Sequence, residues 1–456
     1  MSRQRIALGV GANALDKVIA AAIQLLLVPI LASHWGLARY GGWAMLTTVP
    51  GVLALGDLGF ANAATVRMTM QVARGELAQA RTTIRSATQV VAMACGLIVV
   101  LVAVIAATLP AQAILDVPQT SDAEMRRAFV FLAVYAALIM GCGLMQGVFR
   151  STQRFALGTL LSTVTAVMEN GLLVLVVFQG HGIAAAATAL MAGRLAGFVT
   201  MFATAAMLKT GLLPGFTGGD RQTRRDLLAP ALAAMAIPLA TALLLQGTVA
   251  ALGFVAGAIA VPAFVTARTL SRIGLQGSQM LTTALMPEFG AATAQGNRRA
   301  VLRMFVAVLG TAAAIAVPFA VLLALAGPWI ILHWSNHNIH VGEGLMLAIA
   351  ASALCGGIWN PLSNLMLAIN RQSEFAIAYA ILAGLAVILT LALGASLGGT
   401  APALALALVD AAMLVVVARF AVRHWGSHGD WGRTMVELSD QARSDIGRLI
   451  AGRQQD

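Results

Sequence analysis

The chain has 456 residues, of which 59% are hydrophobic and only 10% are charged. Soluble domains carry about 25% charged residues, so this composition excludes an ordinary water-soluble protein and predicts that a lipid bilayer is its solvent. The apolar runs are long and uninterrupted, which excludes a β-barrel of short alternating strands. The net charge of +11 does not indicate a nucleic-acid partner, because most arginines fall in short connections where they set membrane topology.

Hydropathy predicts twelve membrane-spanning helices in two sets of six. The first set covers residues 8–32, 42–66, 86–109, 128–149, 156–179 and 183–207, and the second covers 230–252, 258–285, 302–326, 343–368, 375–396 and 401–422. We therefore predict an all-α polytopic membrane protein with two six-helix bundles, over residues 1–208 and 229–422. A cytoplasmic linker at 209–228 joins them. The cytoplasmic tail at 423–456 forms either an amphipathic helix on the membrane or a frayed soluble segment.

The connections between the spans alternate in charge. One set holds most of the arginines, as in ARGELAQAR at 73–81 and DRQTRRDLL at 220–228. The other set is short and nearly uncharged, as in GHGI at 180–183 and LGGTA at 397–401. The positive-inside rule places the arginine-rich set, and with it both termini, in the cytoplasm.

The two halves of the chain share short sequence matches at an offset near 220 residues. ARGELAQARTTIRSA at 73–87 parallels AQGNRRAVLRMFVA at 294–307, and FRSTQRFA at 149–156 parallels INRQSEFA at 369–376. Each matched segment follows an even number of spans, so the halves have the same orientation in the membrane. This pattern favours a parallel duplication over chance matches in an alanine-rich sequence.

One long apolar segment, residues 261–286, carries two arginines near its middle. Arg268 and Arg272 are four residues apart, so on a helix they share one face with Gln276. A guanidinium at the bilayer centre costs roughly 2.5–3.5 kcal/mol on insertion scales, and it cannot shed its proton. No acid occurs over residues 227–287, so the neutralising charge must come from another helix or from a ligand. Arginine binds phosphate in bidentate fashion, which predicts a basic cavity for a phosphate or pyrophosphate group.

Charged residues in the first bundle have structural alternatives to a functional role. Asp16 and Lys17 in the first span could neutralise each other, since lysine can extend toward the membrane surface. Arg194 in the sixth span could form a structural ion pair with Glu169 in the fifth. Neither alternative excludes contact with a ligand.

Two further acids stand apart from other charges in their spans. Asp57 lies within GDLGF at 56–60 and could cap a bend or be protonated. Asp410 has no charged neighbour in the sequence and could be a protonated or paired packing group. A functional role remains open for both.

Enzyme and metal-site signatures are missing from the sequence. There is no P-loop, so ATP does not power the protein directly. No large loop is available for a polymerase or glycosyl-transfer site, and no carboxylates are paired at catalytic spacing in a loop. The three cysteines, Cys95, Cys142 and Cys355, lie in apolar helices and indicate packing residues, with no disulfide or metal site. We predict a protein that is not an enzyme and has no cofactor.

The first 90 residues resemble the polysaccharide-transport (Wzx-type) flippases, which belong to the superfamily of multidrug and toxin extruders and lipid II flippases. The resemblance rests on HWGLARYGGWAML at 34–46, on LGDLGF at 55–60 and on the arginine-rich segment at 73–81. The matching residues are Gly36, Tyr40, Gly41, Trp43, Asp57, Leu58 and Gly59. In architecture the resemblance spans the whole chain.

This resemblance implies a V-shaped pair of bundles with a MATE-like transporter fold in the bacterial inner membrane. It implies an undecaprenyl-pyrophosphate-linked oligosaccharide as cargo, moved between leaflets by alternating access, with a polysaccharide polymerase, glycosyltransferases and membrane lipids as partners. The carried glycan could belong to an O-antigen, a capsule or an exopolysaccharide. Coupling to a proton or sodium gradient is also implied.

The candidate site residues follow from that cargo. The residues expected to hold the pyrophosphate are Arg268, Arg272, Lys17 and Arg194; those expected to bind sugars are Asn13, Gln24, Gln276, Asn360 and Asn364; and those expected to couple an ion are Asp16, Asp57 and Asp410. Two alternatives stay open. A multidrug or cation antiporter of the same superfamily would need an acidic or neutral cavity, against which the arginines argue. A membrane scaffold of a polysaccharide assembly complex would move nothing.

Overall fold

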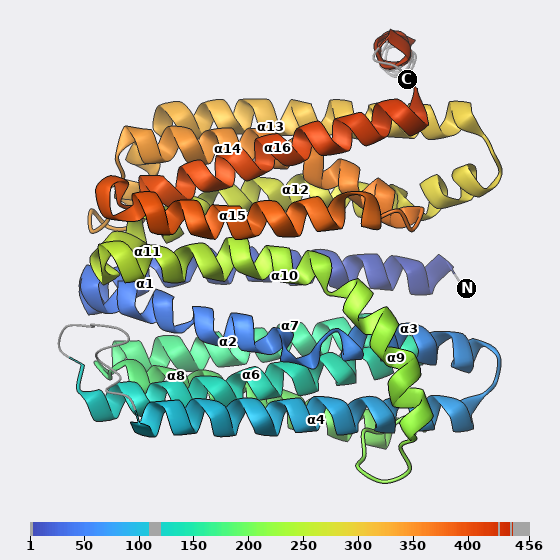
Figure 1. The fold of residues 1–456 in the computed structure, drawn as a ribbon, viewed down its shortest axis with the longest axis horizontal. Helices are drawn as coiled ribbons and strands as arrows, with labels where there is room; N and C mark the ends of the chain where they lie inside the picture. Colours follow the sequence, from blue (N-terminus) through green and yellow to red (C-terminus); the bar gives the residue numbers. More distant parts are fainter. Residues whose placement is uncertain (1–2, 109–119, 427–428, 438–439, 441–456) are drawn as a thin grey trace, which may run out of the picture. The chain divides into compact units, whose positions relative to one another are not determined.

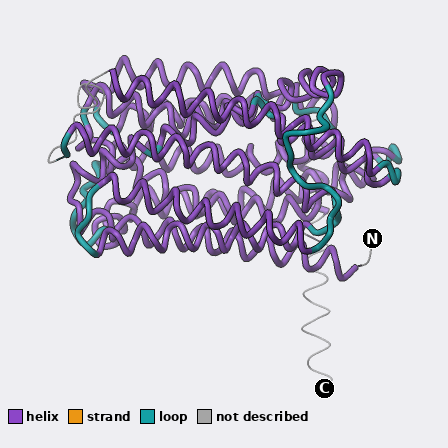
Figure 2. The backbone as a smooth tube through the Cα atoms, turned by 90° about the horizontal axis from the view of Figure 1, so that it is seen from below, coloured by secondary structure: helices purple, strands orange, loops and turns teal. Residues whose placement is uncertain are grey.

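A computed structural model describes residues 3–108, 120–426, 429–437 and 440. These residues form long helices joined by short loops, with no β-strand among them (Figures 1 and 2). Hydrophobic runs of 20 or more residues satisfy their backbone hydrogen bonds internally only as helices in a bilayer. The predicted all-α class is therefore confirmed. Residues 109–119, which belong to the connection between the third and fourth predicted spans, lie outside the described residues.

The helices follow one another along the chain with few interruptions. In order they are α1 (Arg3–Leu46), α2 (Thr48–Leu53), the 3₁₀ turn η1 (Ala54–Asp57), α3 (Phe60–Ala73), α4 (Leu77–Thr108), α6 (Asp122–Ser151), α7 (Phe155–Phe178), α8 (Ile183–Met207), α9 (Arg221–Ala234), α10 (Ala236–Ala242), the π-helical segment η2 (Leu243–Gly247), α11 (Thr248–Ala256), η3 (Ala258–Ala260), α12 (Val261–Ala294), α13 (Arg298–Trp334), α14 (Glu343–Ala368), α15 (Ser373–Leu397) and α16 (Thr400–Trp425).

Ten helical stretches of the described chain are long and apolar enough to span a membrane. One of them, Gly11–Asp57, has 47 residues, about 70 Å of helix and enough for two crossings. Gly36 breaks it with φ 69° and ψ 171°, and the chain reverses direction there (Figure 1). The 34-residue helix α12 is also long enough, but its arginines and hydroxyl residues make it less apolar. With these two additions the ten stretches account for the twelve predicted spans.

The chain forms two compact units. The first comprises Met1–Thr269, Trp329–Val341 and Ala380–Pro402, and the second comprises Leu270–Pro328, Gly342–Tyr379 and Ala403–Asp456. The predicted boundaries at 208 and 229 and the predicted pairing of two six-helix bundles stay predictions.

Close helix packing in the first unit depends on small residues. A Cβ at Gly193 of α8 would lie 2.5 Å from Cα of Glu169, and one at Gly197 would lie 2.2 Å from Cγ2 of Thr165, both on α7. Glycine at these two positions therefore lets the two backbones meet, as is common where helices associate within lipid. The α3, α4 and α6 helices enclose a separate apolar core that includes the fully buried Phe149 and Met68.

The predicted linker lies against the first unit. Arg81 Nε donates to the Gly211 carbonyl at 2.8 Å, and Gln89 Nε2 donates to the Phe216 carbonyl at 2.7 Å. Ser86 Oγ accepts from the Asp220 backbone N–H at 2.9 Å. Because these three donors and acceptors lie on α4, residues 211–220 follow that helix rather than crossing open solvent.

The short connections after α3 and α12 have the same backbone geometry. Gly75 and Gly296 both adopt positive φ, 79° and 67°. The N–H of Gly75 bonds the Val72 carbonyl at 3.1 Å, and that of Gly296 bonds the Thr293 carbonyl at 3.0 Å. Each turn then starts the next helix in the same way. This shared geometry agrees with the duplication that the sequence predicts.

Of the predicted tail, the structure describes only residues up to 426, 429–437 and 440, and residues 429–437 are largely helical. Trp431 packs on Phe305, with ring centroids 5.0 Å apart. The greater part of the predicted amphipathic helix lies outside the described residues.

Candidate functional site

The first arginine of the α12 pair binds a helical irregularity. Arg268 Nη1 donates to the Leu245 carbonyl at 2.6 Å, and its guanidinium lies 5.1 Å from the centre of the Phe264 ring. Leu245 belongs to the π-helical segment η2, where the regular i to i−4 hydrogen bonding of the helix is interrupted. A buried carbonyl needs a donor, and Arg268 supplies one within the first unit.

The second arginine, Arg272, lies within electrostatic range of an acid on a distant helix of the second unit, without forming a direct ion pair with it. It interacts electrostatically with Tyr379 of α15 and with Asp410 of α16. Since residues 227–287 contain no acid, a counter-charge for Arg272 had to come from another part of the chain or from a ligand. Asp410 is such an acid. A candidate for binding an anion and a candidate for coupling an ion are brought together here.

The Asp410 carboxyl group is held by two donors from α14. Trp359 Nε1 donates to Oδ1 at 2.9 Å, and Ser352 Oγ donates to Oδ2. Gly356 lies between these donors on α14, and a Cβ there would come 3.3 Å from the Asp410 carboxyl carbon. The Trp359 ring in turn packs edge-on against Tyr379, with centroids 5.3 Å apart. The carboxyl group is therefore fixed in position by its neighbours.

Arg194 forms a buried ion pair in the first unit. Its Nη2 lies 2.6 Å from Glu169 Oε1, and the two side chains are only 15% and 5% exposed. Tyr135 OH donates to the same Glu169 oxygen at 3.2 Å and accepts from Arg194 at 3.3 Å. The ion pair expected between Arg194 and Glu169 is thus present. Among the described residues, Arg194 Nε and Glu169 Oε2 are buried without a hydrogen-bond partner, so both groups can still bind something more.

The charges of the first span lie at the α1–α7 contact. Thr163 Oγ1 donates to Asp16 Oδ1 at 2.8 Å, and Lys17 Nζ lies 3.7 Å from Asp16 Oδ2. The Lys17 side chain is 48% exposed. The neighbouring acid and base therefore neutralise each other, as one of the two interpretations predicts, while the lysine remains accessible.

Asp57 caps a bend and borders a cavity. Its Oδ1 accepts from the Gly59 backbone N–H at 3.0 Å, and its Oδ2 accepts from that of Ala61 at 3.3 Å. These bonds stabilise the start of α3, where side-chain oxygens commonly satisfy the first N–H groups. The cavity has a volume of about 340 Å³, and its polar lining also includes Asn62, Thr65, Gln146 and Arg150.

The residues expected to bind sugars are distributed over three helices, and all are partly buried: Asn13 and Gln24 on α1, Gln276 on α12, and Asn360 and Asn364 on α14. Asn360 Nδ2 donates to the Gly356 carbonyl at 3.1 Å. Asn360 is therefore close to the Asp410 network, because Gly356 lies against the Asp410 carboxyl group.

Sequence reasoning missed the neutral members of these networks. Tyr135, Ser352, Trp359 and Tyr379 carry no charge, and in an apolar helix they are normally packing residues. Only the positions of their partners reveal their role. Among the described residues, no group of three or more His, Cys, Asp or Glu side chains is close enough to hold a metal ion.

Known proteins resemble this chain at two levels, its family and its fold. A family model described as polysaccharide biosynthesis protein matches residues 6–292. None of the curated proteins compared matches the chain significantly.

Solved transporter structures share the fold at low sequence identity. An inward-facing multidrug resistance MATE family transporter of the MOP superfamily has a TM-score of 0.67 at 13% identity, covering 89% of this chain and 98% of its own. The lipid II flippase MurJ, in an inward closed conformation, has a TM-score of 0.62 at 14% identity, covering 94% and 90%. A MOP superfamily transporter from Pyrococcus furiosus has a TM-score of 0.53 at 14% identity, covering 92% and 94%. The predicted MATE-like fold is confirmed.

Proposed function

Because this chain belongs to the polysaccharide biosynthesis protein family, we propose that it is a flippase that moves a lipid-linked oligosaccharide across the bacterial inner membrane. The cargo we propose is an undecaprenyl-pyrophosphate-linked repeat unit, delivered for O-antigen, capsule or exopolysaccharide synthesis. The chain transports and catalyses no covalent chemistry. A multi-pass membrane protein with a transporter fold can carry a charged head group through the bilayer while the prenyl tail stays in lipid.

The placement of Arg272 near Asp410 in the second unit, without a direct ion pair among the described residues, is the observation that carries this proposal. A guanidinium stays charged at any accessible pH, so inside a membrane it needs a counter-charge. Asp410 is that counter-charge when no ligand is bound. A pyrophosphate offers more oxygens and more negative charge than one carboxylate, and charge-assisted bidentate bonds are the strong ones. The arriving cargo therefore replaces Asp410 as the main counter-charge of Arg272.

Ion coupling follows from that exchange. Once Arg272 binds pyrophosphate, the Asp410 carboxylate has lost its cation and accepts a proton or a sodium ion in its place. Release of the cargo on the other side restores the pair and expels the ion. Arg268, Lys17 and Arg194 add positive charge for the same head group, and Asn13, Gln24, Gln276, Asn360 and Asn364 bind its sugars. Asp16 and Asp57 are further ion-binding candidates in the first half.

Orientation follows the arginine-rich connections. We propose that both termini and the linker lie in the cytoplasm, because lysine and arginine near span ends are retained on that side. Lipid-linked cargo then enters from the cytoplasmic leaflet, where glycosyltransferases would build it, and leaves toward a polymerase.

The decisive experiment is transport by purified protein in liposomes with a fluorescently labelled polyprenyl-pyrophosphate oligosaccharide. Wild-type protein is expected to move the label to the opposite leaflet, and Arg272→Ala to reduce the rate at least tenfold. Arg272→Lys keeps the charge but not the bidentate geometry and is expected to retain part of the rate. Arg303→Ala, an exposed arginine at the start of α13, is the matched control and is expected to transport normally.

Three outcomes would overturn the basic site or favour one of the alternatives. Normal transport by both Arg268→Ala and Arg272→Ala would overturn the basic site. No translocation by well-folded wild-type protein would favour the scaffold instead. A deletion strain that becomes sensitive to cationic drugs, while its surface glycan stays normal, would favour the multidrug antiporter.

A further inference from the structure

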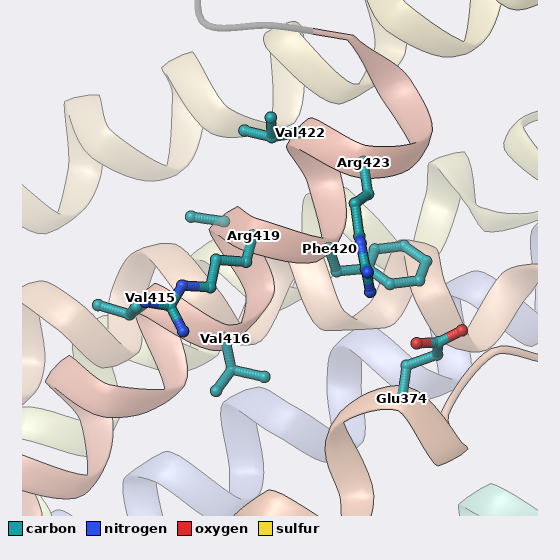
Figure 3. Close-up of a pocket in the computed structure, with 8 residues that line it drawn as sticks. Glu374, Val415, Val416, Arg419, Phe420, Val422 and Arg423 are labelled. Atoms are coloured by element: carbon teal, nitrogen blue, oxygen red, sulfur yellow. The ribbon is translucent and has the colours of Figure 1, made fainter.

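A cavity in the second unit is separate from the Arg272 network. It has a volume of about 850 Å³ and lies between the start of α15 and the last turns of α16. Figure 3 shows Arg419 and Arg423 extending from α16 beside Val415 and Phe420, with Glu374 at the start of α15. The cavity therefore combines a polar end with an apolar wall.

The charges in and beside this cavity do not balance. Glu374 is the acid in its lining, and Arg371 lies 3.5 Å from it as an ion-pair partner. Arg371 also contacts His424 Nε2. The two arginines on α16 form no hydrogen bond or ion pair with other described residues. Within the described part of the chain, two positive charges without an ion-pair partner therefore remain at positions i and i+4 on one helix face.

The length of α16 indicates how deep in the membrane the cavity lies. The helix has 26 residues and is about 39 Å long, whereas the hydrocarbon core is about 30 Å thick. Arg419, Arg423 and the terminal Trp425 therefore reach the head-group region, which is where tryptophan and arginine are enriched. Val415, one turn deeper than Arg419, lines the cavity and is 51% exposed, so in a bilayer it faces acyl chains.

We propose that this cavity binds an anionic glycerophospholipid of the surrounding membrane. The Arg419 and Arg423 guanidinium groups hold the lipid phosphate, and the acyl chains lie along Val415 and Val416. The charge complementarity selects an anionic over a zwitterionic head group, since each basic residue near the surface favours anionic lipid. This site goes beyond the transport function and does not depend on it.

Native mass spectrometry of the full-length protein in detergent, titrated with phosphatidylglycerol or phosphatidylcholine, tests the proposal. The wild-type protein is expected to bind phosphatidylglycerol at least tenfold more tightly. The double variant Arg419→Ala/Arg423→Ala is expected to lose about thirtyfold in that affinity. The charge-preserving Arg419→Lys/Arg423→Lys variant should retain most of it, and Arg74→Ala, an exposed arginine after α3, should bind as the wild type does.

Three results would overturn the site. They are equal binding of the two lipids by wild-type protein, unchanged binding by the double alanine variant, and displacement of phosphatidylglycerol by equimolar undecaprenyl pyrophosphate, which would assign the cavity to the carrier lipid. Lipid binding is measured without transport, so a failed flippase assay leaves this test unaffected. A failure of the cavity to bind lipid likewise leaves the flippase assay unaffected.

Discussion

The indole N–H of Trp359 donates a 2.9 Å hydrogen bond to Oδ1 of Asp410, joining α14 to α16 at the carboxyl group whose charge acts on Arg272. A tryptophan whose ring makes an edge-type contact with Tyr379 and whose N–H binds an acid fixes both partners at once. The geometry of the Arg272 network therefore depends on a residue that is itself uncharged.

Replacing Trp359 by phenylalanine keeps an aromatic ring and removes the N–H donor. We expect a loss of about 1–3 kcal/mol in the free energy of unfolding, because a buried acceptor loses its partner. Thermal unfolding in detergent measures it. Trp329→Phe is the control, since Trp329 is 63% exposed and should change stability little. Equal effects at the two positions would contradict the role assigned to Trp359.

Breaking the buried pair of Arg194 and Glu169 is expected to be costly. Removing one partner of a buried ion pair leaves an uncompensated charge and typically costs about 3–5 kcal/mol. Glu169→Ala should therefore lower the unfolding temperature markedly, and Arg194→Ala should do the same.

Arg126 and Asp122 provide the matched comparison. They form a 2.7 Å pair at spacing i, i+4, but their side chains are 39% and 36% exposed. Arg126→Ala is expected to cost at most about 1 kcal/mol, as exposed pairs do. If Arg126→Ala and Glu169→Ala shift the unfolding temperature by the same amount, the buried pair contributes no more to stability than the exposed pair.

Gly59 and Gly75 have the same backbone conformation but different surroundings, so substitutions there distinguish backbone strain from steric crowding of a new side chain. Gly59 and Gly75 both have positive φ, 77° and 79°. A Cβ at Gly59 would lie 2.5 Å from the Ala231 carbonyl oxygen, whereas nothing lies within 4 Å at Gly75. Gly75→Ala should cost about 1–2 kcal/mol for the left-handed conformation alone. Gly59→Ala should cost about 1–3 kcal/mol more through overpacking, measured by thermal unfolding of both variants.

The N-cap of α9 gives a pH-dependent prediction outside the membrane. Asp220 Oδ2 accepts from the Thr223 backbone N–H at 2.8 Å, and this hydrogen bond lowers the pKa of the Asp220 carboxyl group. A lowered folded-state pKa means that the cap is fully formed above the unfolded value of about 3.9 and is lost as the pH falls through the folded-state value.

Hydrogen exchange of the first amides of α9, corrected for intrinsic rates, measures that loss. In wild-type protein the protection should fall in acid below about pH 4. Asparagine is a comparably good N-cap without a titrating group, so Asp220→Asn should keep its protection there. A wild-type profile that stays flat down to pH 2 would show that the cap does not titrate.

The sequence predicts the helices well because hydropathy reports directly on the solvent that surrounds them. It also predicts the Arg194–Glu169 pair, since two opposite charges on successive apolar spans have few other ways to be neutralised. It could not identify Asp410 as the partner of Arg272, because their helices are distant in the chain and only three-dimensional packing brings them together.

The sequence also gives no signal for local irregularities in the helices. Nothing in the residues Leu243–Gly247 marks a π-helical turn, because the same apolar residues form regular α-helix elsewhere. The turn and Arg268 are explained together, since the arginine binds a carbonyl that the irregular helix exposes. The cavity beside Arg419 and Arg423 was not predicted either. The sequence marks these arginines only as topology signals, and the structure adds Glu374 of α15, which lines the cavity and is paired with Arg371 in the connection before that helix.

Residues 211–220, bound along α4 by Arg81, Ser86 and Gln89, do not behave as a free linker. The chain as far as Thr269 belongs to the first unit, and it first passes into the second unit between Thr269 and Leu270, inside α12. A change in the segment 211–220 therefore alters the first unit, so a few residues added at Thr217–Gly219 should leave the second unit folded.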